Sequence, residues 1–145
     1  MCLTGLQDVP VFHYKTKEVL VGQNASLPCL IKNVTYNIVI VSTEWTKKDP
    51  KRTKLALFTP GHDYVYFVPN VTLKTIYNGN DRLIGTHVEL LNVDKRDAGT
   101  YICYMATYPS GSFKRETELK VKGMHYSPYH VHIYLDRSLL KVHTG

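Results

Sequence analysis

Two cysteines and one tryptophan constrain the fold of this 145-residue chain more than any other feature. Trp45, the only tryptophan, lies between Cys29 and Cys103 and closer to the first of them. This order is typical of a two-sheet β-sandwich, in which an inward-facing tryptophan packs against a disulfide that joins the sheets. Such disulfides persist in oxidising compartments, so the chain is predicted to be extracellular, either at a cell surface or secreted. Cys2 is left over and is expected to be a remnant or an intermolecular bridge.

Alternation of apolar and polar residues runs through most of the chain and is interrupted by turn residues, as an all-β domain requires. No stretch keeps a helical period over three turns. The strands are predicted at 9–21, 24–32, 37–48, 54–60, 62–68, 73–78, 86–93, 99–108 and 112–122.

The extra strand between Trp45 and residue 73 predicts the variable type of the immunoglobulin sandwich, with about nine strands in a Greek key. Cys29 and Cys103 would form its inter-sheet disulfide. Residues 7–122 are predicted to be this domain and 1–6 an extension. Residues 123–145 are expected to be a linker with the start of a truncated second domain, or a tail without a partner sheet.

Other residues of the segment 97–103 are interpreted as scaffold. Tyr101 stands two residues before Cys103, where its hydroxyl can bond back to the chain in a tyrosine corner. Asp97 is expected to pair with Lys74, with Arg82 as the alternative.

Charge and sequons constrain the partners. The net charge is +6, and basic residues cluster at 47–54 and 113–122. These clusters indicate either a solvated surface or steering toward an acidic protein or a sulfated glycan. Sequons at Asn24, Asn33 and Asn70 predict N-glycosylation, and nucleic acid is not expected as a partner of such a domain.

Strand parity predicts one apolar outer face. Because Trp45, Tyr101 and Cys103 should point inward, alternate residues of their strands should point outward. A face this apolar usually marks a protein interface, although a second domain or a glycan would also cover it. The residues expected on it are Ile40, Ser42, Ala56, Phe58, Ile102, Tyr104 and Tyr108.

The segment TYPSG at Thr107–Gly111 resembles the T-(F/Y)-P-x-G motif of the nectin and poliovirus-receptor-like family, which includes TIGIT and the DNAX accessory molecule. Segments 53–64 and 99–112 are similar to the same family, and the resemblance covers roughly residues 7–122. In that family two sandwiches meet through their outer faces, and an aromatic key of each enters a lock on the other.

The resemblance implies specific roles for residues of this chain. Tyr108 would be the key, Thr107 would bind the partner beside it, and Pro109 and Gly111 would hold the tip and belong to the same partner-binding set. The lock would be lined by Ala56, Phe58, Thr59 and Pro60.

Two departures from the family pattern affect the predicted lock. Asp63 stands where the family has glycine, and Gly61 comes two residues early. The family's strand pattern over residues 40–42 is matched only at Ile40. The predicted partner is therefore another nectin-like ectodomain rather than a second copy, with a homodimer as the alternative.

Other functions are weaker interpretations of the same residues. The domain could be a ligand of another immune family, such as OX-2-like or co-stimulatory ligands, or a soluble decoy. His130 and His132 would share a strand face, but no cysteine or acidic pair at ligand spacing accompanies them, so neither a metal nor a cofactor is expected. No catalytic motif is present, so an enzyme is not expected.

The start of the chain lacks the pattern of an intact signal peptide. The longest aliphatic run, 38–41, is too short to cross a bilayer, so membrane attachment would need segments outside this chain.

Overall fold

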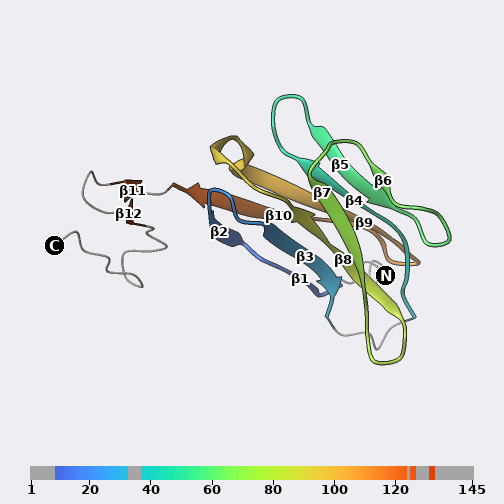
Figure 1. Cartoon of the computed structure of the whole chain (residues 1–145). Coiled ribbons are helices and arrows are strands. Elements are labelled where there is room, and N and C mark those ends of the chain that lie inside the picture. Colours follow the sequence, from blue (N-terminus) through green and yellow to red (C-terminus); the bar gives the residue numbers. More distant parts are fainter. Residues whose placement is uncertain (1–8, 33–36, 124, 127–130, 133–145) are drawn as a thin grey trace, which may run out of the picture.

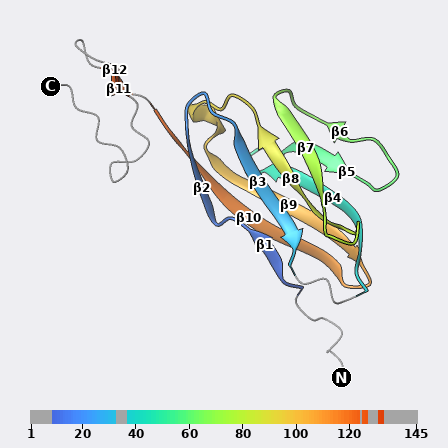
Figure 2. The same ribbon diagram turned by 60° about the horizontal axis from the view of Figure 1, so that its bottom comes forward.

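A computed structural model describes residues 9–32, 37–123, 125–126 and 131–132. Two β-sheets pack face to face in two layers, as Figures 1 and 2 show. The four-stranded sheet has the order β1-β3-β8-β7 and the six-stranded sheet the order β2-β10-β9-β4-β5-β6. The predicted all-β immunoglobulin sandwich is confirmed.

Most strand bounds lie close to the predicted ranges, but the strand predicted at 86–93 begins and ends three residues earlier, and the one predicted at 62–68 is only two residues long. The four-stranded sheet consists of β1 (Val11–His13), β3 (Ala25–Ile31), β8 (Leu83–Leu90) and β7 (Val71–Tyr77). The six-stranded sheet consists of β2 (Thr16–Leu20), β10 (Gly111–Lys122), β9 (Gly99–Tyr108), β4 (Val39–Lys47), β5 (Thr53–Phe58) and β6 (Val65–Tyr66). All these pairs are antiparallel except β2 with β10, which is parallel.

Alternation within each strand places the core between the sheets. In β3, Ala25, Leu27, Cys29 and Ile31 are buried, while the residues between them are half-buried on the outer surface. The same period in β8 buries Val88 and Leu90. Removing this apolar surface from water is the main stabilising contribution to the sandwich.

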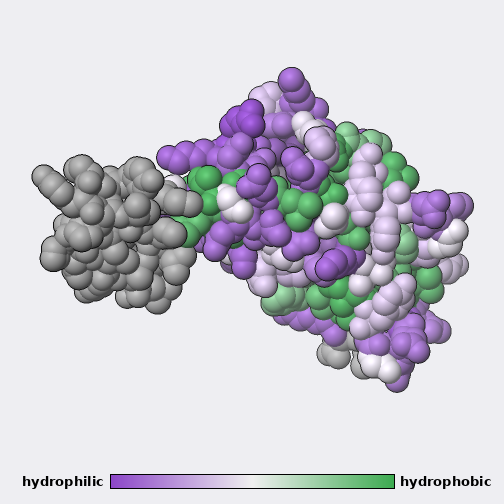
Figure 3. Space-filling model, viewed as in Figure 1, coloured by the Kyte–Doolittle hydropathy of each residue, from purple (hydrophilic) through white to green (hydrophobic). Residues whose placement is uncertain are grey.

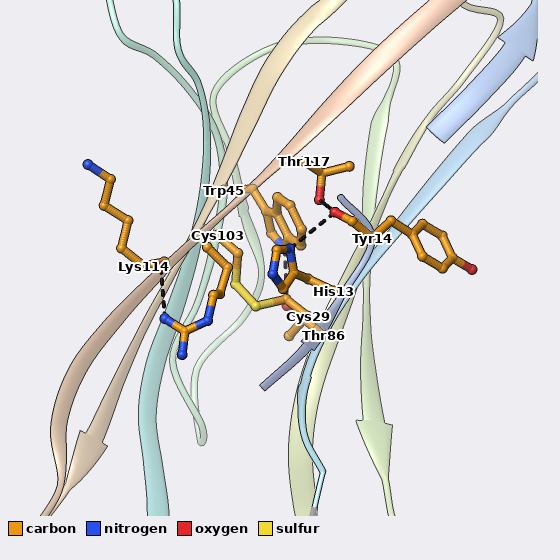
Figure 4. The surroundings of a disulfide bond; sticks show 9 residues. His13, Tyr14, Cys29, Trp45, Thr86, Cys103, Lys114 and Thr117 are labelled. Carbon is orange, nitrogen blue, oxygen red and sulfur yellow. Dashed lines mark hydrogen bonds between the residues drawn. A yellow bond between two sulfur atoms is a disulfide. The ribbon is translucent and has the colours of Figure 1, made fainter. Parts of the chain in front are cut away.

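The centre of the core is the predicted disulfide and tryptophan. Cys29 and Cys103 are bonded across the two sheets, with their Cα atoms 6.5 Å apart. Trp45 is fully buried beside them, as Figure 4 shows. Its indole Nε1–H donates to Thr86 Oγ1 at 3.2 Å, so the one polar atom of the ring is satisfied inside the core.

The tyrosine corner also forms as predicted. The Tyr101 hydroxyl donates to the Asp97 carbonyl at 2.5 Å and ties β9 to the 3₁₀ turn η1 (Lys95–Asp97). Burial, followed by the nearby negative charge of Asp97, raises the pKa of Tyr101 well above its ordinary value. The phenol therefore stays neutral in the folded domain.

The predicted ion pair between Asp97 and Lys74 is wrong. The Asp97 carboxylate instead accepts from the Asp94 backbone N–H at 2.8 Å and closes a capping box around η1. Lys74 is exposed in mid-β7 opposite His87, and the alternative partner Arg82 donates to the Ile38 carbonyl.

A different cation lies at the corner. Lys47 Nζ donates to the Arg96 carbonyl at 2.7 Å and lies 5.8 Å from the centroid of the Tyr101 ring. Because Lys47 arrives from β4, no spacing within the segment that contains Asp97 could identify it.

Within the predicted tail, two short strands pair antiparallel, β11 (His125–Tyr126) and β12 (Val131–His132). His130 lies outside the described residues, as do residues 124, 127–129 and 133–145 of the predicted tail. In the part of the chain that the structure describes, no helix has the length and apolarity to cross a membrane.

Candidate protein-binding face

The surface of the six-stranded sheet turned away from the core is the candidate site, and we call it the six-strand face. It is built from the outward residues of the strands β10, β9, β4, β5 and β6. Its principal exposed or half-buried side chains are Val39, Val41, Ser42, Glu44, Arg52, Lys54, Leu57, Val65, Tyr104, Tyr108 and Lys114.

Tyr108 forms the tip of this face at the end of β9. Its side chain is 71% exposed, the largest value among the exposed large hydrophobic residues of the described chain. Gly111 has φ of +87°, which other residues rarely adopt, and allows the chain to turn back into β10. Pro109 is exposed beside it, and the Tyr108–Pro109 peptide bond is cis.

Thr107 supports the tip rather than presenting itself to a partner. Its side chain is buried, and its Oγ1 donates to the Gly111 carbonyl at 2.7 Å. This hydrogen bond closes the turn that carries Tyr108. The predicted contact of Thr107 with a partner is therefore wrong, because its side chain is buried and has a structural role.

A bulge in β4 changes which residues reach the six-strand face. Ile40 pairs with Thr107 and Ser42 with Ala106, so Val41 has no partner of its own on β9. The extra residue reverses the parity of the strand beyond it. Ile40 is consequently buried in the core, and its predicted outward position is wrong.

Val39 and Val41 take the place predicted for Ile40. They are 59% and 48% exposed. Val39 lies directly opposite Tyr108 in the β4–β9 ladder. The tip is therefore an apolar cluster rather than a single aromatic ring.

A second irregularity corrects the predicted positions in β5. Ala56 pairs with the inward-facing Trp45 and Phe58 with the buried Thr43, so both belong to the core. The register shifts beside Trp45, and Leu57, opposite Glu44, is the residue that faces outward. The predicted exposure of Ala56 and Phe58 is wrong.

The predicted lock is thus only partly accessible. Of the four residues expected to line it, Thr59 is half-buried and Pro60 is exposed, in a turn where His62 N–H donates to the Thr59 carbonyl at 2.9 Å. Ala56 and Phe58 cannot touch a partner from the core.

Another apolar cluster lies on the β5–β6 side. Leu57 pairs with Val65, which is exposed. Phe67, two residues after Val65, is also exposed, and Lys54 Nζ lies 5.9 Å from the centroid of its ring. The six-strand face thus carries one apolar group at the tip and another at its β5–β6 edge.

A hollow lies between these two clusters. Its volume is about 390 Å³, and its wall includes Ser42, Glu44, Arg52, Lys54, Leu57 and Tyr104. Ser42 and Tyr104 thus stand where parity predicted them, on the six-strand face.

Ile102 lies on this side of the sheet but is not available to a partner. It pairs with Thr46 on one side and Glu116 on the other, and it is fully buried although it does not belong to the core between the sheets. The ion pair from Lys48 Nζ to Glu116, 3.2 Å long, joins the flanking strands and must pass over β9 between them. The aliphatic parts of such long side chains cover apolar groups beneath them.

The charges of the face are unbalanced. Glu44 is paired with Lys54 at 3.8 Å, and Glu116 with Lys48. Within the described residues Arg52 and Lys114 are exposed and make no ion pair. The face therefore carries an excess of positive charge beside its hollow.

Two predicted glycosylation sites lie far from the tip. Asn24 precedes β3 and Asn70 precedes β7, both beside the end of β8. Tyr108 is at the opposite end of β9 from the turn that contains Asp97. The third site, Asn33, lies outside the described residues.

Val39, Val41 and Leu57 were not predicted on the six-strand face, and they reach it because of the bulge in β4 and the register shift in β5. The run of four aliphatic residues at 38–41 has no alternation, so it could not reveal which of its members points inward. For Leu57, the sequence carries no signal of the register shift beside Trp45 that turns it outward.

Exposed apolar residues also occur outside those named on the six-strand face, among them Phe12 and Tyr77. In the view of Figure 3, hydrophobic residues form several separate patches among hydrophilic ones. Exposed hydrophobic residues that stand singly are normal for a soluble surface, whereas clustered ones mark contact sites.

Comparison with known proteins agrees with the immunoglobulin fold. The model of the immunoglobulin V-set domain matches residues 14–122. CD226 antigen of Macaca mulatta is 27% identical over 96 residues, which are 65% of this chain and 27% of that protein. The chain thus spans about a quarter of the length of this relative. The resemblance predicted from the TYPSG segment is confirmed as a distant relationship.

A solved structure shares the fold. Murine CRIg superposes with a TM-score of 0.60, at 10% sequence identity, over 81% of this chain and 98% of that one. At this identity the likeness concerns the fold alone.

Proposed function

The chain belongs to the immunoglobulin V-set domain family, and on this basis we propose that it recognises another immunoglobulin domain outside the cell through the six-strand face. V-set domains are not enzymes, which excludes the catalytic interpretation. The proposed partners are nectin and poliovirus-receptor-like ectodomains. The setting is a cell surface, or the extracellular fluid for a secreted form.

The observation that carries this proposal is Tyr108, 71% exposed at a closed turn and flanked by Val39 on the same face. Tyrosines that desolvate at the centre of an interface are frequent hot spots. A stable contact of about 1,200–2,000 Å² in total would extend from this tip over the hollow to Leu57.

The charges favour a different partner over a second copy. A two-fold dimer places the same surface on both sides of the interface, so the unpaired Arg52 and Lys114 of each copy would meet a basic face. An acidic face on another ectodomain would complement them.

A binding titration tests the proposal. The domain is first screened against nectin-like ectodomains, and Tyr108→Ala is then compared with Tyr77→Ala. Tyr77 is a matched control because it is 54% exposed but lies in the four-stranded sheet. We expect Tyr108→Ala to weaken binding at least about 30-fold, or roughly 2 kcal/mol, with unchanged thermal unfolding.

The control should bind like the unmodified domain. Equal affinities for the Tyr108→Ala variant and the unmodified domain would refute the proposed face.

A further inference from the structure

The end of the sandwich farthest from Tyr108 has an opening into the core. A hollow of about 290 Å³ lies there between the two sheets, and Leu55 and Leu90, both members of the core, form part of its wall. Asp49 and Arg96 contribute charged groups to the same wall. The hollow thus combines apolar surface with hydrogen-bonding groups.

Asn70 also lines this hollow and begins the sequon Asn70-Val71-Thr72. It is exposed and has φ of +60°. Its carbonyl accepts from the Leu91 N–H at 2.8 Å, which fixes its backbone at the rim. Anything attached to the Asn70 side chain therefore starts at the edge of the hollow.

We propose that Asn70 carries an N-linked glycan whose first N-acetylglucosamine is seated in this hollow and closes the open end of the core. A pyranose ring presents C–H groups on its faces and hydroxyl and acetamide groups around its edge. The C–H groups pack on the apolar wall, and the polar groups bond to Asp49, Asn92 and Arg96.

The attachment is the ordinary transfer from a lipid-diphosphate-linked oligosaccharide in the secretory pathway. The Asn70 amide nitrogen attacks C1 of the first sugar and forms the N–C1 bond. The bond from C1 to the phosphate oxygen breaks, the lipid diphosphate leaves, and the amide loses one proton.

Asn24 offers a matched comparison. It begins another sequon on the other side of β8, about 10 Å from Asn70 at two strand spacings. Its Oδ1 accepts from the Asn92 N–H at 2.9 Å, and Asn24 does not line the hollow. A glycan at Asn24 therefore does not start at the edge of this hollow.

Thermal unfolding of glycoforms tests the proposal. The chain is produced in animal cells that make high-mannose glycans, and occupancy is read by mass spectrometry of glycopeptides. An endoglycosidase then trims each glycan to its first sugar. We expect trimming to leave Tm unchanged, and loss of the Asn70 site by Thr72→Ala to lower Tm by at least about 3 °C.

Two controls separate the effect of the sugar on Tm from the effect of the Thr72 side chain. Thr72 Oγ1 donates to Glu89 at 3.4 Å, so the same variant and the unmodified chain are also made in a bacterial periplasm, where neither carries a glycan. The difference in Tm between these two gives the effect of the side chain alone. Thr72→Ser keeps both the hydroxyl and the sequon and should behave like the unmodified chain.

An unoccupied Asn70 would overturn the proposal. So would a Tm loss that the periplasmic pair reproduces, or an equal loss on Asn24→Gln once the effect of that substitution in the periplasmic chain is subtracted, since Asn24 Oδ1 accepts from the Asn92 N–H. Partner binding is a separate readout, because Tyr101 lines the hollow and Tyr108 lies seven residues farther along β9, about 23 Å away. Failure of the glycan proposal would thus leave the proposed binding face untouched.

Discussion

Val39 and Tyr108 lie opposite each other in the β4–β9 ladder and both project from the same surface of the sandwich. Ile40, the next residue, is buried in the core. The boundary between the six-strand face and the core therefore passes between two adjacent aliphatic residues. A mutation on either side of it should have a different consequence.

Alanine substitutions at these neighbours test the boundary. We expect Val39→Ala to weaken partner binding by about 1 kcal/mol, roughly fivefold, without loss of stability, because the side chain is exposed in the free domain. Ile40→Ala should instead lower the free energy of unfolding by about 2–5 kcal/mol through the cavity it leaves. Titration calorimetry and urea unfolding measure the two effects. A stable Ile40→Ala variant would contradict the assigned parity of β4.

Arg52 and Lys114 should govern the rate of association. Both are exposed on the six-strand face without an ion pair in the described chain, so they would attract an acidic partner over a distance. We expect the double substitution to glutamine to lower the association rate constant about tenfold at low salt, with a smaller effect on dissociation. Surface plasmon resonance across a range of ionic strength would show this. Lys15→Gln combined with Lys74→Gln, at exposed positions away from the face, removes the same charge and should change the rate much less.

Two buried threonines should respond oppositely to the same change. Thr43 is fully buried, and its Oγ1 has no hydrogen-bond partner within the described residues, whereas Thr86 Oγ1 accepts from the Trp45 indole. Thr43→Val should raise the free energy of unfolding by about 1 kcal/mol, since it removes a desolvated hydroxyl. Thr86→Val should lower it by about 1–3 kcal/mol, since the indole N–H loses its acceptor. Chemical denaturation compares them directly, and two shifts of equal sign would contradict this account.

Stability at high pH should depend on Tyr101. Burial raises its pKa in the folded domain above 10.0, so above that pH the unfolded chain loses this proton while the folded domain keeps it. The stabilising effect is therefore present below about pH 10 and is lost as pH rises further, by up to about 1.4 kcal/mol per pH unit. Tyr101→Phe removes the titration but also the hydrogen bond to Asp97, so it should be less stable at pH 7 by about 1 kcal/mol.

The slope of stability against pH distinguishes the titration of Tyr101 from the loss of its hydrogen bond. Between pH 10 and 11 we expect stability to fall less steeply for Tyr101→Phe than for the unmodified domain, because all other titrating groups are shared. Parallel pH profiles in urea unfolding would show that Tyr101 can ionise in the folded state.

Much of the fold was predictable because its determinants are local or repeat along the chain. The positions of Cys29, Trp45 and Cys103 define the core, and the spacing of Tyr101 from Cys103 places its hydroxyl at the corner. Alternation located the strands, since burial on one face requires an apolar residue at every second position. The exposed Tyr108 was predictable for the same reason, because β9 keeps its parity without interruption from Tyr101 to the tip.

Tertiary structure alone decided which of Val39, Ile40 and Val41 reach the six-strand face, and whether Leu57 or Phe58 does. A bulge exists only where two residues of one strand oppose one residue of its neighbour, so it is a property of the pairing and leaves no mark in an aliphatic run. The ion pair over Ile102 and the Lys47 contact at the corner likewise join strands distant in sequence. The amino-acid pattern therefore determined the sandwich and its tip, and the meeting of distant strands determined the surface around that tip.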